Sequence, residues 1–331
     1  MKTIIRASGL VAAALLAACS SSDGVGTSLD ESGLPRDAYA VDDTACPAPR
    51  CFEFAVPLPA GVNITDNRVR VILPEGYATS GKRYPLLYLL HDAPGDYTSW
   101  TRLGKAMEYL RDLEVIGVMP DGGGGHAGWY SDWEDGSFQW ETYHLDVMMP
   151  FVEQRVRGLG DGHRAVAGPS MGGYGSMIYS AKYPGMFKAA ASFSSPVDFL
   201  HLDRISALYS FLGNPIAGTP NGPIWGNPVT NWARWQEQDP GTNVAGMAGM
   251  RVLISSGNGL PGGPNGLASP PFYVIEPLVL LQSMALAQTT QAAGVDTRTL
   301  FYGPGYHDWP CFLDGFEWAL PQMMEVIAPA R

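Results

Sequence analysis

The chain has 331 residues, of which 46% are hydrophobic and 16% are charged. This balance supports a sizeable folded core and argues against an intrinsically disordered chain. The 21 basic and 32 acidic residues give a formal charge of -11, which argues against nucleic acid as a partner because phosphate binding needs clustered Lys and Arg. The composition therefore indicates an acidic globular protein.

Residues 1–19 have the organisation of an export signal. Lys2 and Arg6 precede a short apolar stretch, 9–18, which is too short to span a bilayer comfortably. The stretch ends in Leu-Ala-Ala-Cys19, which resembles the lipobox of bacterial lipoproteins, where the cysteine becomes lipidated. An ordinary cleavage site followed by a chance cysteine is the alternative. Because no second hydrophobic stretch is long enough to span a membrane, we expect an exported protein anchored through acyl chains on Cys19, or else secreted.

Residues 20–45 are rich in Ser, Gly, Asp and Thr, and they are predicted to form a flexible tether. Residues 46–331 are predicted to form one α/β domain. Cys46 and Cys51 lie at its start and could close a small disulfide loop in an exported protein, with two unpaired thiols as the alternative. The chain contains neither a CxxC pair nor HExxH, so the sequence implies no metal site, and it implies no cofactor.

From residue 51 onward, apolar runs typical of buried strands alternate with helical patterns. Strands are predicted at 52–57, 69–74, 85–91, 115–120, 164–167, 189–194, 251–256 and 297–302. Helices are predicted at 105–113, 141–157, 171–183 and 272–293, with a last one at the C-terminus. This alternation predicts a mostly parallel sheet covered by helices on both faces. Residues 196–250 are too long for a plain connection, and we expect a cap-like insertion over the active site, with a structural extension as the alternative.

The sequence Gly168-Pro-Ser170-Met-Gly172 is the one GxSxG motif in the chain. Forty glycines could produce such a motif by accident, but here a predicted strand precedes it and a predicted helix follows it. That context is typical of a nucleophile elbow, in which a strained turn projects the serine hydroxyl above the sheet. Ser170 is therefore the candidate nucleophile.

A serine nucleophile needs a base, and six histidines are available. His307 is the only one that follows the last predicted strand. Folds that carry a nucleophile elbow of this kind place the base after their last strand. Six carboxylates between Ser170 and His307 could orient the imidazole: Asp198, Asp203, Glu237, Asp239, Glu276 and Asp296. Asp296 precedes the last strand and so lies at the wrong end of the sheet. Spacing favours Glu276, with Asp198 second.

The intermediate of acyl transfer carries an oxyanion, which backbone N–H groups can stabilise. Met171, directly after the nucleophile, supplies the first expected donor. Ala93 is the expected second donor, in the loop after strand 85–91, with Asp92 as the near alternative; Pro94 has no N–H. His91 and Asp92 are expected to shape this loop and the substrate site. Trp133 and Trp309 are candidates to line an acyl groove, with core packing as the alternative.

These motifs together resemble the antigen 85 mycolyltransferase and esterase D-like branch of the α/β-hydrolase fold. The resemblance extends from about Arg68 to the C-terminal helix. The segments that carry it are Leu89-Leu-His-Asp92, Tyr130-Ser-Asp-Trp133, Trp140-Glu-Thr, Ile224-Trp-Gly, Asp239-Pro240 and Gly257-Asn-Gly-Leu-Pro261. In that family the acid is a helix glutamate about thirty residues before the histidine. Glu276 stands 31 residues before His307, so the resemblance favours Glu276 over Asp198.

The chain also departs from that family in three places. It has His307-Asp308-Trp309 where the family has His-Ser-Trp, Ser256 where the mycolyltransferases have cysteine, and Ala93-Pro94 where they have Leu-Arg. These changes argue against trehalose and mycolate specificity. The expected activity is that of a serine esterase acting through an acyl-enzyme. Acyl transfer to a sugar or other alcohol is the alternative, and a non-catalytic surface binding lipoprotein is the rival from another class.

Overall fold

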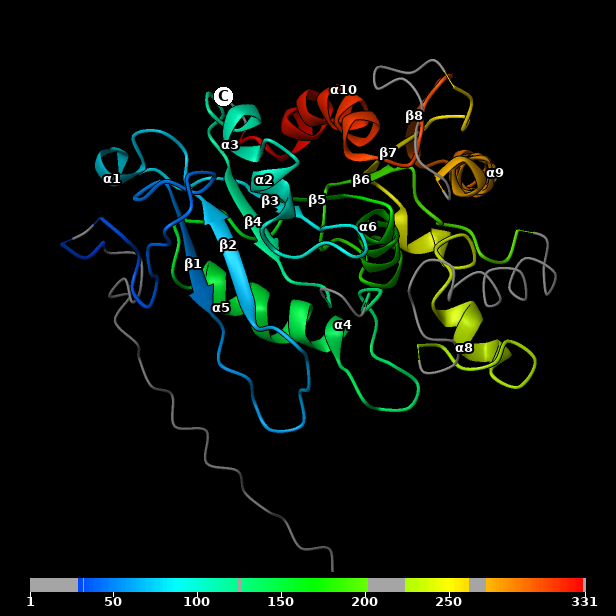
Figure 1. Ribbon diagram of the computed structural model, residues 1–331, viewed down its shortest axis with the longest axis horizontal. Helices are drawn as coiled ribbons and strands as arrows, with labels where there is room; N and C mark the ends of the chain where they lie inside the picture. Colours follow the sequence, from blue (N-terminus) through cyan, green and yellow to red (C-terminus); the bar gives the residue numbers. More distant parts are fainter. Residues whose placement is uncertain (1–28, 32, 124–126, 202–223, 262–271, 330–331) are drawn as a thin grey trace, which may run out of the picture.

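The computed structural model describes residues 29–31, 33–123, 127–201, 224–261 and 272–329. An eight-stranded sheet runs through its centre in the order β1-β2-β4-β3-β5-β6-β7-β8 (Figure 1). Its strands are β1 Cys51–Ala55, β2 Arg68–Ile72, β3 Leu86–Leu89, β4 Ile116–Pro120, β5 Arg164–Pro169, β6 Ala189–Phe193, β7 Arg251–Ser256 and β8 Asp296–Phe301. The pairs β1–β2 and β2–β4 are antiparallel, and all pairs from β4 to β8 are parallel. The mostly parallel α/β architecture predicted from the sequence is confirmed.

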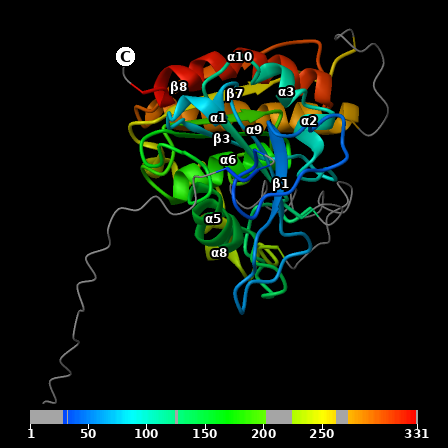
Figure 2. The same cartoon turned by 90° about the vertical axis from the view of Figure 1, so that its left-hand side faces the viewer.

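Helices cover both faces of the sheet and close a separate hydrophobic core on each (Figures 1 and 2). The face with the short helices α2 and α3 also carries the C-terminal helix α10. The other face carries α4, α5, α6 and α9. The helix bounds are α1 Tyr77–Ser80, α2 Ser99–Arg102, α3 Ala106–Tyr109, α4 Trp140–Thr142, α5 Met149–Glu153, α6 Met171–Lys182, α8 Trp232–Glu237, α9 Phe272–Ala292 and α10 Trp309–Ile327.

The central strands are buried on both sides, as continuous apolar runs in a parallel sheet require. Every residue of β3, β4 and β6 is buried. The β6 sequence Ala-Ala-Ala-Ser-Phe has small side chains where α6 and α10 pack against the sheet. The strand that leads into Ser170, β5, lies between β3 and β6, two strands whose residues are all buried.

Two predicted helices differ in detail from the structure. The helix expected at 105–113 is only α3, four residues long and separated from α2 by Gly104, where a side chain would meet Trp100 and Trp309. The helix expected at 141–157 begins at Trp140, passes through a π-helical turn at Tyr143–Met148, and ends at Glu153.

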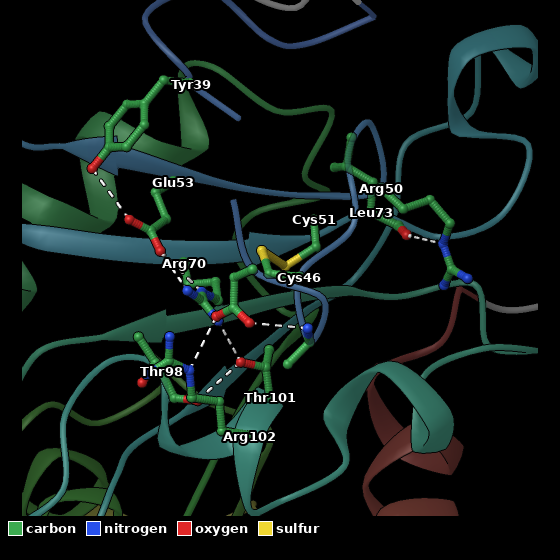
Figure 3. The surroundings of a disulfide bond; sticks show 12 residues. Tyr39, Cys46, Arg50, Cys51, Glu53, Arg70, Leu73, Thr98, Thr101 and Arg102 are labelled. Carbon is green, nitrogen blue, oxygen red and sulfur yellow. Dashed lines mark hydrogen bonds and ion pairs between the residues drawn. A yellow bond between two sulfur atoms is a disulfide. The ribbon is translucent and has the colours of Figure 1, made fainter. Parts of the chain in front are cut away.

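The N-terminal segment lies along the edge of the sheet, beside a disulfide that joins Cys46 to Cys51 (Figure 3). Tyr39 pairs with Glu53 of β1 through backbone hydrogen bonds in both directions. Leu34 is buried in the core on the face of the sheet that carries α6. The tether predicted for residues 20–45 is therefore wrong from about residue 33 onward, because backbone pairing and burial fix that part to the domain.

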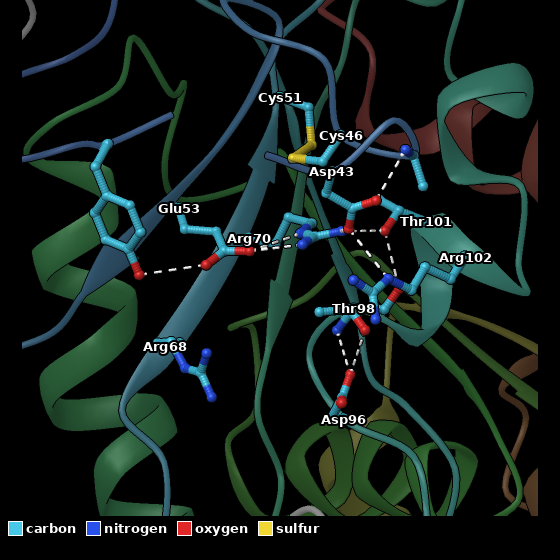
Figure 4. Close-up of polar contacts among 12 residues, drawn as sticks. Asp43, Cys46, Cys51, Glu53, Arg68, Arg70, Asp96, Thr98, Thr101 and Arg102 are labelled. Atoms are coloured by element: carbon cyan, nitrogen blue, oxygen red, sulfur yellow. Dashed lines mark hydrogen bonds and ion pairs between the residues drawn. A yellow bond between two sulfur atoms is a disulfide. The ribbon is translucent and has the colours of Figure 1, made fainter. Parts of the chain in front are cut away.

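A buried arginine connects this N-terminal segment to α2 (Figure 4). The Arg70 guanidinium is 2% exposed and bonds the carboxylates of Glu53 and Asp43 at 2.6 and 2.9 Å. It also donates to Thr101 Oγ1 at 2.6 Å, and Arg102 pairs with Asp43 at 3.1 Å. Burying a charge is costly unless it is paired, and here every charge in the cluster has a partner.

Residues 202–223 of the predicted cap-like insertion lie outside the described residues. The described parts pack on α6: Trp225 contacts Tyr174 of that helix and donates to Ser131 Oγ at 3.1 Å. Its role as a cap stays a prediction. In the described part of the chain, no helix combines the length and apolar character that crossing a membrane would require.

Candidate active site

Ser170 occupies the turn between β5 and α6 in a strained conformation, with φ 51° and ψ -122°. A positive φ is unfavourable for a residue with a side chain, and it persists where the surroundings enforce it. The Ser170 N–H donates to Phe193 O at 2.9 Å, and the Ser170 carbonyl accepts from the N–H groups of Gly173 and Tyr174. These bonds hold the elbow from both sides.

The glycines of the motif are required by close backbone approach. A Cβ at Gly168 would lie 2.4 Å from the Gly172 carbonyl carbon, and one at Gly172 would lie 2.4 Å from Leu90 O. Neither position has room for a side chain. The second contact brings the loop after β3 against the first turn of α6, which places the two predicted oxyanion segments side by side.

The three residues predicted as a triad form one hydrogen-bonded chain. His307 Nε2 lies 2.8 Å from Ser170 Oγ, and His307 Nδ1 lies 2.9 Å from Glu276 Oε2. The imidazole reaches the site from the loop after β8, and the carboxylate comes from α9. The distances match a base that can take the serine proton while the acid holds its tautomer.

Glu276 is fully buried, and its second oxygen is saturated with donors. Glu276 Oε1 accepts from Ser194 Oγ at 2.7 Å, Gly257 N at 2.9 Å and Ser256 Oγ at 3.1 Å. Hydrogen bonds to a carboxylate stabilise its charged form against the cost of burial. Together with the bond to His307, four hydrogen bonds satisfy both oxygens of this buried carboxylate.

Sequence reasoning missed Ser194 in this site. It follows β6, has φ 50°, and its N–H donates to Ser255 O at 2.7 Å. That conformation turns its hydroxyl toward Glu276. No local sequence signal marks a left-handed serine. Ser256 was visible as a departure from the mycolyltransferases, but its contact with the acid was not.

Asp198, the second candidate for the acid, lies elsewhere. It is 4% exposed, and burial together with the nearby Asp239 raises its pKa to about 7. Its carboxyl group lies next to Gly241, in the described part of the insertion. Glu276 is the carboxylate that contacts His307.

The predicted oxyanion donors flank the nucleophile. Met171 begins α6, where the first N–H groups of a helix have no intrahelical acceptor. Ala93 follows β3, in the loop that contacts Gly172 through Leu90 O and His91 O. Among the described residues, no hydrogen bond uses the Ala93 N–H.

Two of the residues predicted to contact substrate, His91 and Trp133, are enclosed in the protein. His91 is 0% exposed and both ring nitrogens bind backbone groups. Trp133 is 7% exposed, donates to Gly128 O, and packs edge-on against Phe138. Both residues form part of the core because their polar atoms find partners inside it.

Asp92 and Trp309 stay near the site. Trp309 is partly exposed, begins α10 two residues after His307, and packs edge-on against Trp100 at 5.2 Å. Its side chain bonds Asp92, whose pKa is raised by burial. The pair connects the loop after β3 with the loop that carries His307.

The comparisons with known proteins decide the family. The pattern of the Putative esterase family matches residues 64–324. The chain belongs to this esterase family. It is 36% identical over 200 residues to a Mycobacterium tuberculosis protein named as an esterase, an alignment that covers 57% of this chain and 42% of that protein. It is 30% identical over 221 residues to the MPT51/MPB51 antigen of Mycobacterium bovis, covering 65% and 68% of the two chains.

A solved structure carries the same fold. The crystal structure of Mycobacterium tuberculosis MPT51 superposes with a TM-score of 0.67 at 24% identity, covering 83% of this chain and 97% of that one. The esterase of Mycobacterium tuberculosis is much longer than its aligned region, and this chain spans less than half of its length. The resemblance to the antigen 85 and esterase branch that the sequence motifs indicated is confirmed at the level of the family.

Proposed function

We propose that this protein is a serine carboxylic-ester hydrolase that works through an acyl-enzyme intermediate. The observation that carries the proposal is the continuous chain from Ser170 Oγ through His307 to the buried carboxylate of Glu276, with bonds of 2.8 and 2.9 Å. Membership of the esterase family supports the same chemistry.

The first half of the reaction forms the acyl-enzyme. Ser170 Oγ attacks the ester carbonyl while its proton passes to His307 Nε2, and Glu276 stabilises the imidazolium that results. The carbonyl electron pair moves to oxygen, where the N–H groups of Met171 and Ala93 stabilise the oxyanion. The tetrahedral intermediate collapses, and His307 donates its proton to the departing alcohol.

The second half repeats these steps with water as the nucleophile. His307 takes a proton from water, the hydroxide attacks the acyl-enzyme, and Ser170 leaves with the proton that His307 returns. An alcohol in place of water would give acyl transfer. That second candidate is supported by 28% identity over 259 residues to a Mycobacterium avium protein named diacylglycerol acyltransferase/mycolyltransferase.

The test is release of p-nitrophenol from butyrate and laurate esters by the protein lacking residues 1–19, beside the variant Ser170→Ala. We expect turnover by the parent protein and a loss of about 10⁴–10⁶-fold in the variant, the range seen when a triad member is removed. Equal turnover by both proteins would overturn the proposal. Turnover that appears only when an alcohol acceptor is added would instead favour the transferase.

We further propose that the protein is exported and anchored by lipid on Cys19. The Leu-Ala-Ala-Cys19 sequence after a short apolar stretch supports this location. Expression of the full chain in a bacterial host with labelled palmitate tests it. Label should enter the parent protein and be lost in Cys19→Ser; label retained in that variant would contradict the anchor.

A further inference from the structure

His91 is the second residue of the loop after β3, and its role follows from what its ring and carbonyl bind. We propose that His91 is a positioning residue for the oxyanion hole: its Nδ1–H fixes the Asp92–Ala93 peptide so that the Ala93 N–H faces the reacting carbonyl. This inference rests on the proposed esterase function, and it concerns how the second oxyanion donor is held in place.

The tautomer of His91 is determined by a backbone donor. Gly122 N lies 2.7 Å from His91 Nε2. A backbone amide can only donate, so Nε2 must be the unprotonated, accepting nitrogen. The proton of the neutral ring is therefore on Nδ1, which lies 2.7 Å from Asp92 O and donates to it.

That bond fixes the orientation of one peptide plane. Asp92 O also accepts from Gly95 N at 2.9 Å, so two donors hold the carbonyl on the same side of the loop. In a trans peptide the C=O and the following N–H point in opposite directions. The N–H of Ala93 must therefore point away from His91, and it is the group left without an acceptor among the described residues.

The ring is enclosed by its neighbours. His91 is 0% exposed, and Tyr130 covers it with ring centroids 5.9 Å apart. The Tyr130 hydroxyl donates to His91 O at 3.0 Å. On the other side, Gly172 of α6 leaves no room between itself and the carbonyls of Leu90 and His91. The loop is thus held against the nucleophile helix before any substrate binds.

Such preorganisation matters because an oxyanion donor contributes only when it is aimed correctly. Removing one donor from an oxyanion hole costs about 10²–10³ in kcat. Pro94, the next residue, has no N–H and cannot replace Ala93. A rotated Asp92–Ala93 peptide should therefore approach the loss expected for a missing donor.

Two substitutions separate the two ring nitrogens. His91→Asn keeps an amide N–H near the position of Nδ1 and loses the contact with Gly122. His91→Gln keeps an acceptor near the position of Nε2 and loses the donor to Asp92 O. The matched control is His163→Gln, because His163 Nδ1 also lies 2.7 Å from a backbone carbonyl, Ile327 O, but precedes β5 at the opposite end of the sheet.

For each variant we would measure kcat, KM and Tm with p-nitrophenyl butyrate, and the inhibition constant of a trifluoromethyl ketone, whose serine adduct carries an oxyanion. In His91→Gln we expect kcat to fall about 10²-fold at nearly constant KM, with the inhibitor weakened in proportion. His91→Asn should retain kcat within about tenfold, and His163→Gln should match the parent protein.

Two results would overturn the inference. One is a His91→Gln variant with the parent kcat and inhibitor affinity. The other is an equal loss of kcat in both His91 variants that follows their loss of Tm, which would indicate packing alone. Failure of the esterase proposal is recognised separately, because Ser170→Ala would then be as active as the parent protein.

Discussion

At the scale of single residues, the environment of Glu276 explains how a fully buried carboxylate can serve a histidine. Three donors hold Oε1, so Oε2 is directed at His307 Nδ1. Ser194 reaches the acid only because its backbone adopts φ 50°. A strained residue beside a reactive group is the usual sign that local strain serves a functional geometry.

Ser194→Ala should therefore lower kcat about tenfold with KM nearly unchanged. A hydrogen bond to a charged group contributes about 1.5–3 kcal/mol. Without it, Glu276 stabilises less well the imidazolium that His307 becomes during the reaction. Ser192→Ala is the matched control, since Ser192 is equally buried on β6 and its Oγ has no partner among the described residues. Steady-state kinetics on both variants decide: equal losses would show that the hydroxyl of Ser194 does not act through Glu276.

At the scale of elements, the sequence predicted the strands and the nucleophile elbow, because both depend on local residue patterns. Apolar runs identified the strands, and the Gly-x-Ser-x-Gly spacing between a strand and a helix identified the elbow. The π-helical turn at 143–148, the split between α2 and α3, and the left-handed Ser194 depend on contacts made by distant residues. The burial of His91 also depends on distant residues, so its position in the loop after β3 did not reveal it.

The arrangement of α2 illustrates such distant contacts. On its outer side Arg70 donates to Thr101 and Arg102 pairs with Asp43, which precedes the disulfide. On its inner side Trp100 donates to Leu90 O at 2.8 Å, one residue before His91. A four-residue helix is not stable alone. Its position is fixed by these side-chain contacts, so the N-terminal segment supports the loop that carries Ala93.

At the scale of the whole molecule, stability should depend on pH through Asp198. Its folded-state pKa of about 7 lies above the ordinary value of 3.8 because the group is buried near Asp239. The folded protein therefore binds this proton more tightly than the unfolded chain does. The contribution of Asp198 to the free energy of unfolding is therefore complete below about pH 4. It is lost as the pH rises to about 7, at a slope of about 1.4 kcal/mol per pH unit at most.

Asp198→Asn removes that proton equilibrium while keeping the size of the side chain, so comparing it with the parent protein reports the titration of Asp198 and its coupling to Asp239. We expect the free energy of unfolding of the variant, relative to the parent, to increase from pH 4 to pH 7 and to stay constant above that. Urea midpoints measured across this range provide the check. A difference that does not vary with pH would mean that Asp198 is ionised in the folded protein, and that the enclosed pair with Asp239 is solvated after all.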